Sequence, residues 1–158
     1  MFRAWTLLPF LSGMIVVCQG CAGPQEAFQN VQLCIADERG VLELKRIMRA
    51  VAQSKNLEFI DNSARQGENL KAMGADKALG RDASRAIDVH IEGENGMGVT
   101  AGNLGLPEYQ VALGFTEGTN PSMARVLSNE LIKALSQRWH VEVVPLGKGA
   151  MPMKTSEG

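Results

Sequence analysis

The sequence predicts an α+β domain, a two-layer sandwich with two long amphipathic helices on one face of a mostly antiparallel sheet of about five to six strands. Apolar residues recur at helical spacing over roughly residues 38–54 and again over 121–139. Several short segments alternate apolar and polar residues, which is typical of strands. The element order β-α-β, an irregular connection, a β-meander and then α-β favours helices on one side of the sheet.

Local signals place most of the elements. Asp37 precedes the first helix and Asn120-Pro121 the second, as N-caps and a first-turn proline commonly do. Three glycines interrupt residues 61–85, so we expect one short helix there and then irregular chain. Pro145 suggests that the last strand is at a sheet edge. The expected elements are strand 31–36, helix 38–54, strand 57–60, helix 68–73, strands 86–93, 97–103 and 109–115, helix 121–139 and strand 141–146.

The register of the central hairpin can be predicted from its alternation. A two-residue loop at Asn95-Gly96 would set polar residues opposite apolar ones. A three-residue loop sets Ile91 opposite Val99 and keeps one face apolar, so we expect that loop, with Gly96 left-handed. This register places three small residues beside the polar side of the first strand: Gly98 beside Glu92, Thr100 beside His90 and Gly102 beside Asp88.

Residues 1–20 have the pattern of an export signal. Arg3 gives a positive start, and the mostly apolar run that follows is shorter than the roughly 20 residues needed to span a bilayer. Gly20-Cys21 resembles a bacterial lipobox, in which a small residue precedes the cysteine that is acylated. Cys18 stands where that family usually has leucine. The resemblance implies that Cys21 is lipidated and anchors the mature chain, because several acyl chains on one residue attach stably to a membrane.

The resemblance also implies a domain organisation and an address. Ala22 follows Cys21 in place of aspartate, which by the sorting rule of Gram-negative envelopes implies the outer membrane, facing the periplasm. The alternatives are an ordinary secretory signal, which would give a soluble secreted or periplasmic protein, and an uncleaved membrane anchor. The expected parts are signal peptide 1–20, lipidated cysteine and tether 21–29, a single α+β domain 30–146 and a flexible tail 147–158.

Composition argues against a nucleic-acid partner. One of the 16 Lys and Arg residues lies in the leader, which leaves 15 against 17 Asp and Glu. This balance gives no general attraction to nucleic acid, and an aromatic content of 5% gives few stacking platforms for bases. Cys34 is the one cysteine left beyond Cys21, so no intramolecular disulfide is expected. Such a cysteine is more often a small buried residue than a reactive thiol.

Asp88, His90 and Glu92 are the candidate chemical groups, on one side of a strand. Neighbours on one strand side are roughly 6.5–7 Å apart, so they share a metal or a proton only where the side chains converge. Zinc sites usually take three or four ligands from two elements, and the opposite residues here are not ligands. We therefore expect no metal and no cofactor. The alternatives are a solvated sheet face and a shallow groove at Gly98, Thr100 and Gly102 where a partner docks.

The element order of the mature domain resembles that of α/β domains in envelope accessory lipoproteins, such as the curli-secretion and penicillin-binding-protein-activator types. Gly74-Ala75-Asp76 is similar to the Gly-x-Asp step of those domains, although residues 77–85 separate it here from the next clear strand. The resemblance carries no functional residue across. We expect a non-enzymatic, membrane-anchored protein that binds another envelope protein or a wall component, with an inhibitor or immunity protein as one form. A small periplasmic hydrolase or metal-binding protein using Asp88, His90 and Glu92 is the alternative, and a subunit of a larger envelope assembly is a third.

Overall fold

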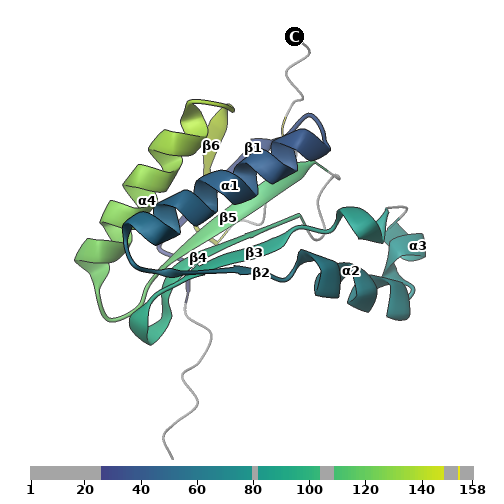
Figure 1. The fold of residues 1–158 in the computed structure, drawn as a ribbon, viewed down its shortest axis with the longest axis horizontal. Helices are drawn as coiled ribbons and strands as arrows, with labels where there is room; N and C mark the ends of the chain where they lie inside the picture. Colours follow the sequence, from purple (N-terminus) through teal and green to yellow (C-terminus); the bar gives the residue numbers. More distant parts are fainter. Residues whose placement is uncertain (1–25, 80–81, 104–108, 148–152, 154–158) are drawn as a thin grey trace, which may run out of the picture.

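Six strands form one antiparallel sheet in a computed structural model of the chain, which describes residues 26–79, 82–103, 109–147 and 153 (Figure 1). The strand order is β2-β3-β4-β5-β1-β6, and each neighbouring pair is antiparallel. The elements are β1 (Gln29–Cys34), α1 (Glu38–Ser54), β2 (Glu58–Asp61), α2 (Ser63–Ala72), α3 (Ala75–Leu79), β3 (Asp88–Glu92), β4 (Met97–Gly102), β5 (Gln110–Glu117), α4 (Pro121–Ser136) and β6 (Val141–Val144), with short 3-10 turns at 83–85 and 94–96.

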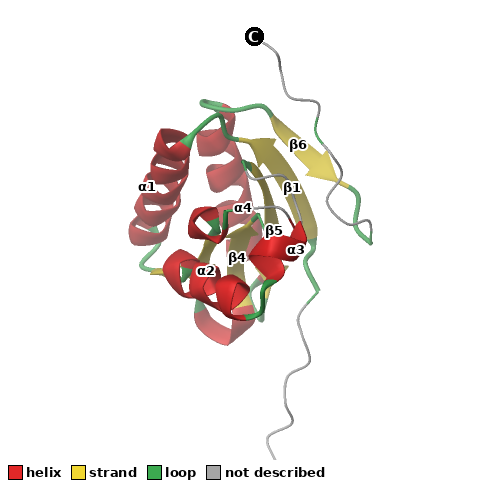
Figure 2. Cartoon of the chain, turned by 90° about the vertical axis from the view of Figure 1, so that its right-hand side faces the viewer, coloured by secondary structure: helices red, strands yellow, loops and turns green. Residues whose placement is uncertain are grey.

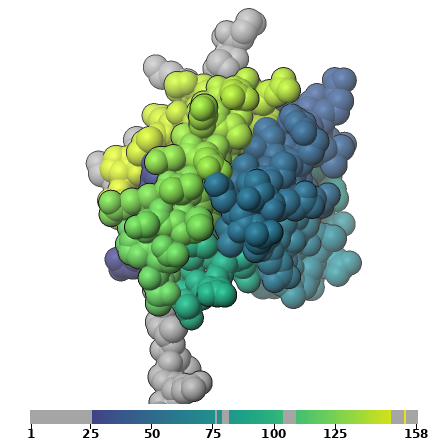
Figure 3. Space-filling view, turned by 60° about the vertical axis from the view of Figure 1, so that its left-hand side comes forward, coloured from purple at the N-terminus to yellow at the C-terminus, as the bar shows by residue number. Residues whose placement is uncertain are grey.

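The two long helices, α1 and α4, lie against each other on one face of the sheet (Figures 2 and 3). An ion pair of 2.6 Å between Lys55 Nζ and Glu130 Oε1 joins them at the surface. The expected α+β fold with two helices on one sheet face is thereby confirmed. The fully buried side chains between the layers include Val31, Leu33, Leu44, Met48, Val89, Ile91, Ala101, Val111, Leu113, Phe115, Leu127, Leu131 and Leu135.

Side-chain caps start both long helices where the sequence predicts them. Asp37 Oδ1 accepts a hydrogen bond from the Gly40 N–H at 2.9 Å, and Asn120 Oδ1 accepts one from the Met123 N–H at 3.1 Å. These bonds satisfy backbone donors that the first helical turn leaves without a partner. The helix α1 has the predicted bounds, whereas α4 ends at Ser136, a few residues earlier than expected.

The segment 61–85 is more regular than expected. We predicted one helix over 68–73 and irregular chain after it. The helix is present as α2 but begins earlier, at Ser63, and the expectation of irregular chain is wrong where α3 follows it. Gly67 does not break the helix. A Cβ there would lie 2.4 Å from the Ala83 carbonyl oxygen, so the glycine lets the 3-10 turn pack directly on α2. The sequence signal for a helix break was therefore a signal for a close contact between segments.

The central hairpin has the predicted register. Ile91 lies opposite Val99 and His90 opposite Thr100, and the Gly93 N–H donates to the Met97 carbonyl at 2.8 Å, which leaves a loop of three residues. Gly96 is left-handed, with φ of +81°, as expected. Asn95 also has a positive φ, of +55°, which the alternation did not predict.

The sheet extends slightly beyond the expected limits of the domain at its start. β1 begins at Gln29, and the Phe28 N–H donates to the Phe115 carbonyl at 2.8 Å, so the end of the expected tether pairs with the sheet. Cys21, the expected signal peptide and most of the expected tail lie outside the described residues. No helix within the described ranges is both long enough and apolar enough to cross a membrane.

Candidate functional site

The sheet face turned away from α1 and α4 carries the six predicted binding-face residues, all of which lie within the described ranges. We call it the open face. Asp88, His90 and Glu92 lie on β3, and the pairing sets Gly102, Thr100 and Gly98 of β4 directly beside them. The next strand adds residues that the sequence analysis missed. Pairing of β4 with β5 places Thr116, Gly114 and Ala112 next to that row, so six small residues on two adjacent strands line the middle of the open face.

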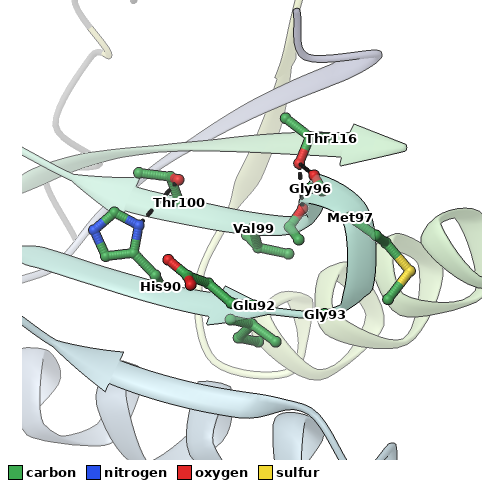
Figure 4. Close-up of a pocket in the computed structure, with 10 residues that line it drawn as sticks. His90, Glu92, Gly93, Gly96, Met97, Val99, Thr100 and Thr116 are labelled. Atoms are coloured by element: carbon green, nitrogen blue, oxygen red, sulfur yellow. Dashed lines mark hydrogen bonds between the residues drawn. The ribbon is translucent and has the colours of Figure 1, made fainter. Parts of the chain in front are cut away.

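His90 bridges two neighbours on the open face. Its Nε2 is 2.8 Å from Asp88 Oδ1. Its Nδ1 is 3.2 Å from Thr100 Oγ1, as Figure 4 shows. In a neutral imidazole with the proton on Nε2, His90 donates to the carboxylate and accepts from the hydroxyl. The three groups thus form a carboxylate–imidazole–hydroxyl line. The side chains of His90 and Asp88 keep 21% and 26% of their exposure, so the line lies at the surface.

Glu92 does not join that line. It is exposed, and the strand pairing places it opposite Glu58 of β2, so two like charges face each other across the sheet. Within the described ranges, no group of three His, Cys, Asp or Glu side chains is placed to hold a metal ion. The structure therefore brings Asp88 and His90 together and leaves Glu92 with a carboxylate neighbour.

A hollow of about 320 Å³ lies at the hairpin end of the open face. Its lining includes His90, Glu92, Met97, Gly98 and Thr116 (Figure 4). A Cβ on Gly98 would lie 2.3 Å from the Ile91 carbonyl oxygen, so the close approach of β3 and β4 alone accounts for this glycine. The hollow is thus partly a consequence of backbone spacing in a tight hairpin.

Part of the other half of the open face, around Gln32 of β1 and Gln110 of β5, is buried. Gln32 and Gln110 are 1% and 2% exposed, and the Gln110 amide donates to Gln32 Oε1 at 3.4 Å. The backbone N–H of Met153 donates to Gln110 Oε1 at 3.5 Å, so the C-terminal segment reaches this part of the sheet. The accessible part of the open face is therefore the β3–β4 half, where the candidate residues lie.

Cys34 lies opposite Gln110 and is half-buried. Burial raises the pKa of the Cys34 thiol above its ordinary value. The thiolate is the nucleophilic form of cysteine, so this environment makes Cys34 less reactive at neutral pH. The position favours the structural interpretation of this residue over a reactive one.

The carboxylate–imidazole–hydroxyl line has the order of groups found in nucleophilic triads. Acyl transfer also requires donors roughly 3 Å from the developing oxyanion, and backbone N–H groups often provide them. Thr100 lies in the middle of β4, which pairs with a strand on each side, so the sheet ladder uses the backbone groups around it.

The geometry of the open face therefore combines a row of small residues, a polar line through His90 and a hollow at the hairpin. This surface offers few kinds of functional group, and it is accessible from solvent. No protein-family model matches the chain, and no curated protein matches it in sequence.

Proposed function

We propose that the chain is a lipid-anchored protein of the bacterial envelope whose domain binds another protein or a cell-wall component. The observation that carries the proposal is Gly20-Cys21 at the end of an export-type leader. Eight positions after Cys21 the first strand begins at Gln29, so the tether is short and the domain works close to the bilayer. Ala22 directs the protein to the outer membrane, with the domain facing the periplasm.

The open face supports binding over catalysis. Its accessible half offers small residues beside Asp88, His90 and Glu92, and the polar groups there are half-exposed or exposed. Catalytic carboxylates and bases are usually set in enclosed sites that exclude water and shift their pKa values. An inhibitor or immunity protein that blocks an enzyme by contact is one form of this function.

Intact mass and membrane fractionation of the native protein and of Cys21→Ser test the anchor. We expect the native chain to begin at Cys21, to carry acyl groups and to fractionate with membranes. The variant should lack the mass of the acyl groups and should no longer fractionate with membranes. Cross-linking in the envelope should then capture a protein or wall fragment on the native chain. An unmodified Cys21 in a soluble fraction would show that the proposal is wrong.

A small periplasmic hydrolase or metal-binding protein is the second candidate. The contacts of 2.8 Å and 3.2 Å that His90 makes with Asp88 and Thr100 favour it. Replacing Asp88, His90 and Glu92 together with alanine separates the two functions. Partner binding that persists with no lost activity would show that Asp88, His90 and Glu92 form no catalytic or metal site. Stoichiometric metal in the native protein that the triple variant lacks, or a hydrolytic activity that it abolishes, supports the second candidate.

A further inference from the structure

β2 forms one edge of the sheet, and within the described part of the chain its one pairing is with β3 (Figure 1). The Asn62 N–H donates to the Asp88 carbonyl at 2.8 Å, which fixes one hydrogen-bonded pair of this ladder. Bonded and non-bonded pairs alternate in antiparallel strands, so Glu58 and Ile60 direct their backbone groups toward β3. Phe59 then directs its N–H and C=O away from the sheet. Outward backbone groups on an edge strand are a template for pairing with another strand.

A groove of about 390 Å³ runs beside this free edge on the helix side, between β2 and α1. Its walls are Arg49 and Gln53 of α1 and Leu57, Phe59 and Asp61 at β2. The guanidinium of Arg49 lies 4.8 Å from the centre of the Phe59 ring, which holds the cation over the groove.

The charges in the groove do not cancel. Lys45 Nζ is 2.9 Å from Asp61 Oδ2, so these two charges neutralise each other. Among the residues that the structure describes, Arg49 has an aromatic ring and not a carboxylate as its neighbour. The groove therefore has room for an apolar side chain and a positive charge for an acidic one.

The opposite side of β2 has the reverse charge. Glu58 faces Glu92 across the ladder, and both side chains are exposed. Like charges directly opposite each other destabilise a sheet. A strand added beyond β2 would place one of its side chains next to Glu58, where a lysine or arginine would relieve this repulsion.

We propose that the free edge of β2 accepts an extended segment of a partner protein as an added strand. Every second residue of that segment is basic and lies on the open side of the sheet, where one of them is the direct neighbour of Glu58. The residues between them are apolar or acidic and enter the groove toward Arg49 and Phe59. This inference rests on the proposed binding function and assigns it a surface and a partner chemistry.

A second copy of the chain fits the edge poorly. Two-fold antiparallel pairing of β2 with β2 keeps the two sides of the sheet, and centred on Phe59 it would set Glu58 of each copy beside Ile60 of the other, so it would bring no basic residue to Glu58. The opposite edge of the sheet, at β6, differs in chemistry, since Val143 is 63% exposed and Pro145 follows the strand. The alternation of charge across β2 thus favours a basic, extended partner segment.

The test uses the full chain purified in detergent and a labelled, blocked peptide of seven residues. The peptide has lysine at positions one, three, five and seven, valine at two and six, and glutamate at four. We expect saturable binding that shifts the amide resonances of Phe59 and Asp61. A peptide of the same composition in block order, with the lysines together, should bind at least about tenfold more weakly, because its charges cannot alternate between the two sides.

Phe59→Pro and Phe59→Val separate strand addition from other contacts. Both remove the ring, but only proline removes the outward N–H, and an edge strand tolerates proline at such a position. We expect Phe59→Pro to bind the peptide about tenfold more weakly than Phe59→Val, which corresponds to one lost hydrogen bond. Equal binding by the two variants, or no saturable binding by the native chain, would overturn the proposal.

Glu58→Lys provides a test that a folding defect cannot mimic. The substitution removes the like-charge pair with Glu92, so the melting temperature should rise while peptide affinity falls. Glu142→Lys makes the same charge change on β6 at the opposite edge, and its affinity should equal that of the native chain. Equal losses of peptide affinity in both variants would indicate a diffuse charge attraction and would overturn the proposal that the peptide binds at β2. These results are independent of the anchor. A soluble protein with an unmodified Cys21 would contradict the proposed function but would leave the peptide titration unchanged.

Discussion

The two faces of the sheet differ in which side chains they can accommodate, and for different physical reasons. On β5, Phe115 points toward the helices and is 1% exposed, whereas its neighbours Gly114 and Thr116 point to the open face and are half-buried. The helix side requires apolar volume, because α1 and α4 must be packed without voids. The open face carries small and polar groups. Backbone spacing and hydrogen bonds between these groups restrict which side chains fit there. The fold therefore depends chiefly on one face and leaves the other for recognition.

The largest expected effect is on the helix side. Phe115→Ala should reduce the free energy of unfolding by about 3–5 kcal/mol, because it removes a buried ring and leaves a cavity. Thr116→Ala, one position along, should cost about 1 kcal/mol or less, the value of its hydrogen bond to the Gly96 carbonyl. Urea denaturation of both variants measures the difference. Similar losses would mean that the two faces contribute equally to stability.

Gly98→Ala tests a position on the open face where side-chain size is as tightly restricted as it is in the core. The new Cβ would lie 2.3 Å from the Ile91 carbonyl oxygen, so β3 and β4 must move apart, at a cost of about 1–3 kcal/mol. Gly102→Ala is the matched control, because its Cβ would lie 3.2 Å from the Ile87 carbonyl oxygen. We expect a clearly smaller loss in urea denaturation for the control. If the control lost as much, side-chain size and not backbone spacing would limit this face.

Asp61 on the helix side of β2 should give an acid-dependent contribution to stability. Burial raises its pKa, but hydrogen bonds from Ser63 and Lys45 and the charge of Lys45 outweigh burial and hold the pKa below its ordinary value. A carboxylate whose pKa falls on folding stabilises the native state above its unfolded pKa of about 3.9 and loses that contribution as the pH falls through the folded value.

Asp61→Asn is the variant that isolates this effect. The native chain should be more stable than Asp61→Asn at pH 7, and the gap should shrink as the pH falls below about 3.9 and through the lower pKa that Asp61 has in the folded state. Urea midpoints across this pH range measure the gap. Glu58→Gln, on the open side of the same strand, is the control, and a gap for Asp61→Asn that is constant with pH would contradict the assignment.

Thr100→Val should have the smallest effect. It removes the hydroxyl beside His90 Nδ1 and keeps a β-branched side chain on the strand. Because the group is exposed and water can replace the hydroxyl, the free energy of unfolding should change by about 1 kcal/mol or less. A loss above about 2 kcal/mol would show that the line through His90 is a structural element and would weaken its interpretation as part of a binding surface.

Local signals in the sequence were sufficient for the parts of the fold that local physics controls. The caps Asp37 and Asn120 marked the starts of both long helices because their side chains bond backbone groups within a few residues. Alternation determined the register of the central hairpin, since a slip of one residue would move Ile91 and Val99 to the wrong face. The candidate residues on β3 and β4 followed from that register.

The remainder depended on contacts between distant segments. In the sequence Gly67 indicates a helix break, whereas in the structure it makes room for the Ala83 carbonyl oxygen, which packs against it. The addition of Ala112, Gly114 and Thr116 to the open face required the pairing of β4 with β5, and the groove beside Phe59 required α1 to pack along an edge strand.

The sequence alone thus determined most of the elements, the hairpin register and the apolar face, because hydrogen bonds and alternation act over a few residues. Only the tertiary structure decided the order β2-β3-β4-β5-β1-β6, in which β1 lies between two strands from the far end of the chain. Many strand orders satisfy the same local pattern, and burial of the whole core selects among them. That choice also leaves β2 at an edge, with Glu58 on one side and Arg49 on the other.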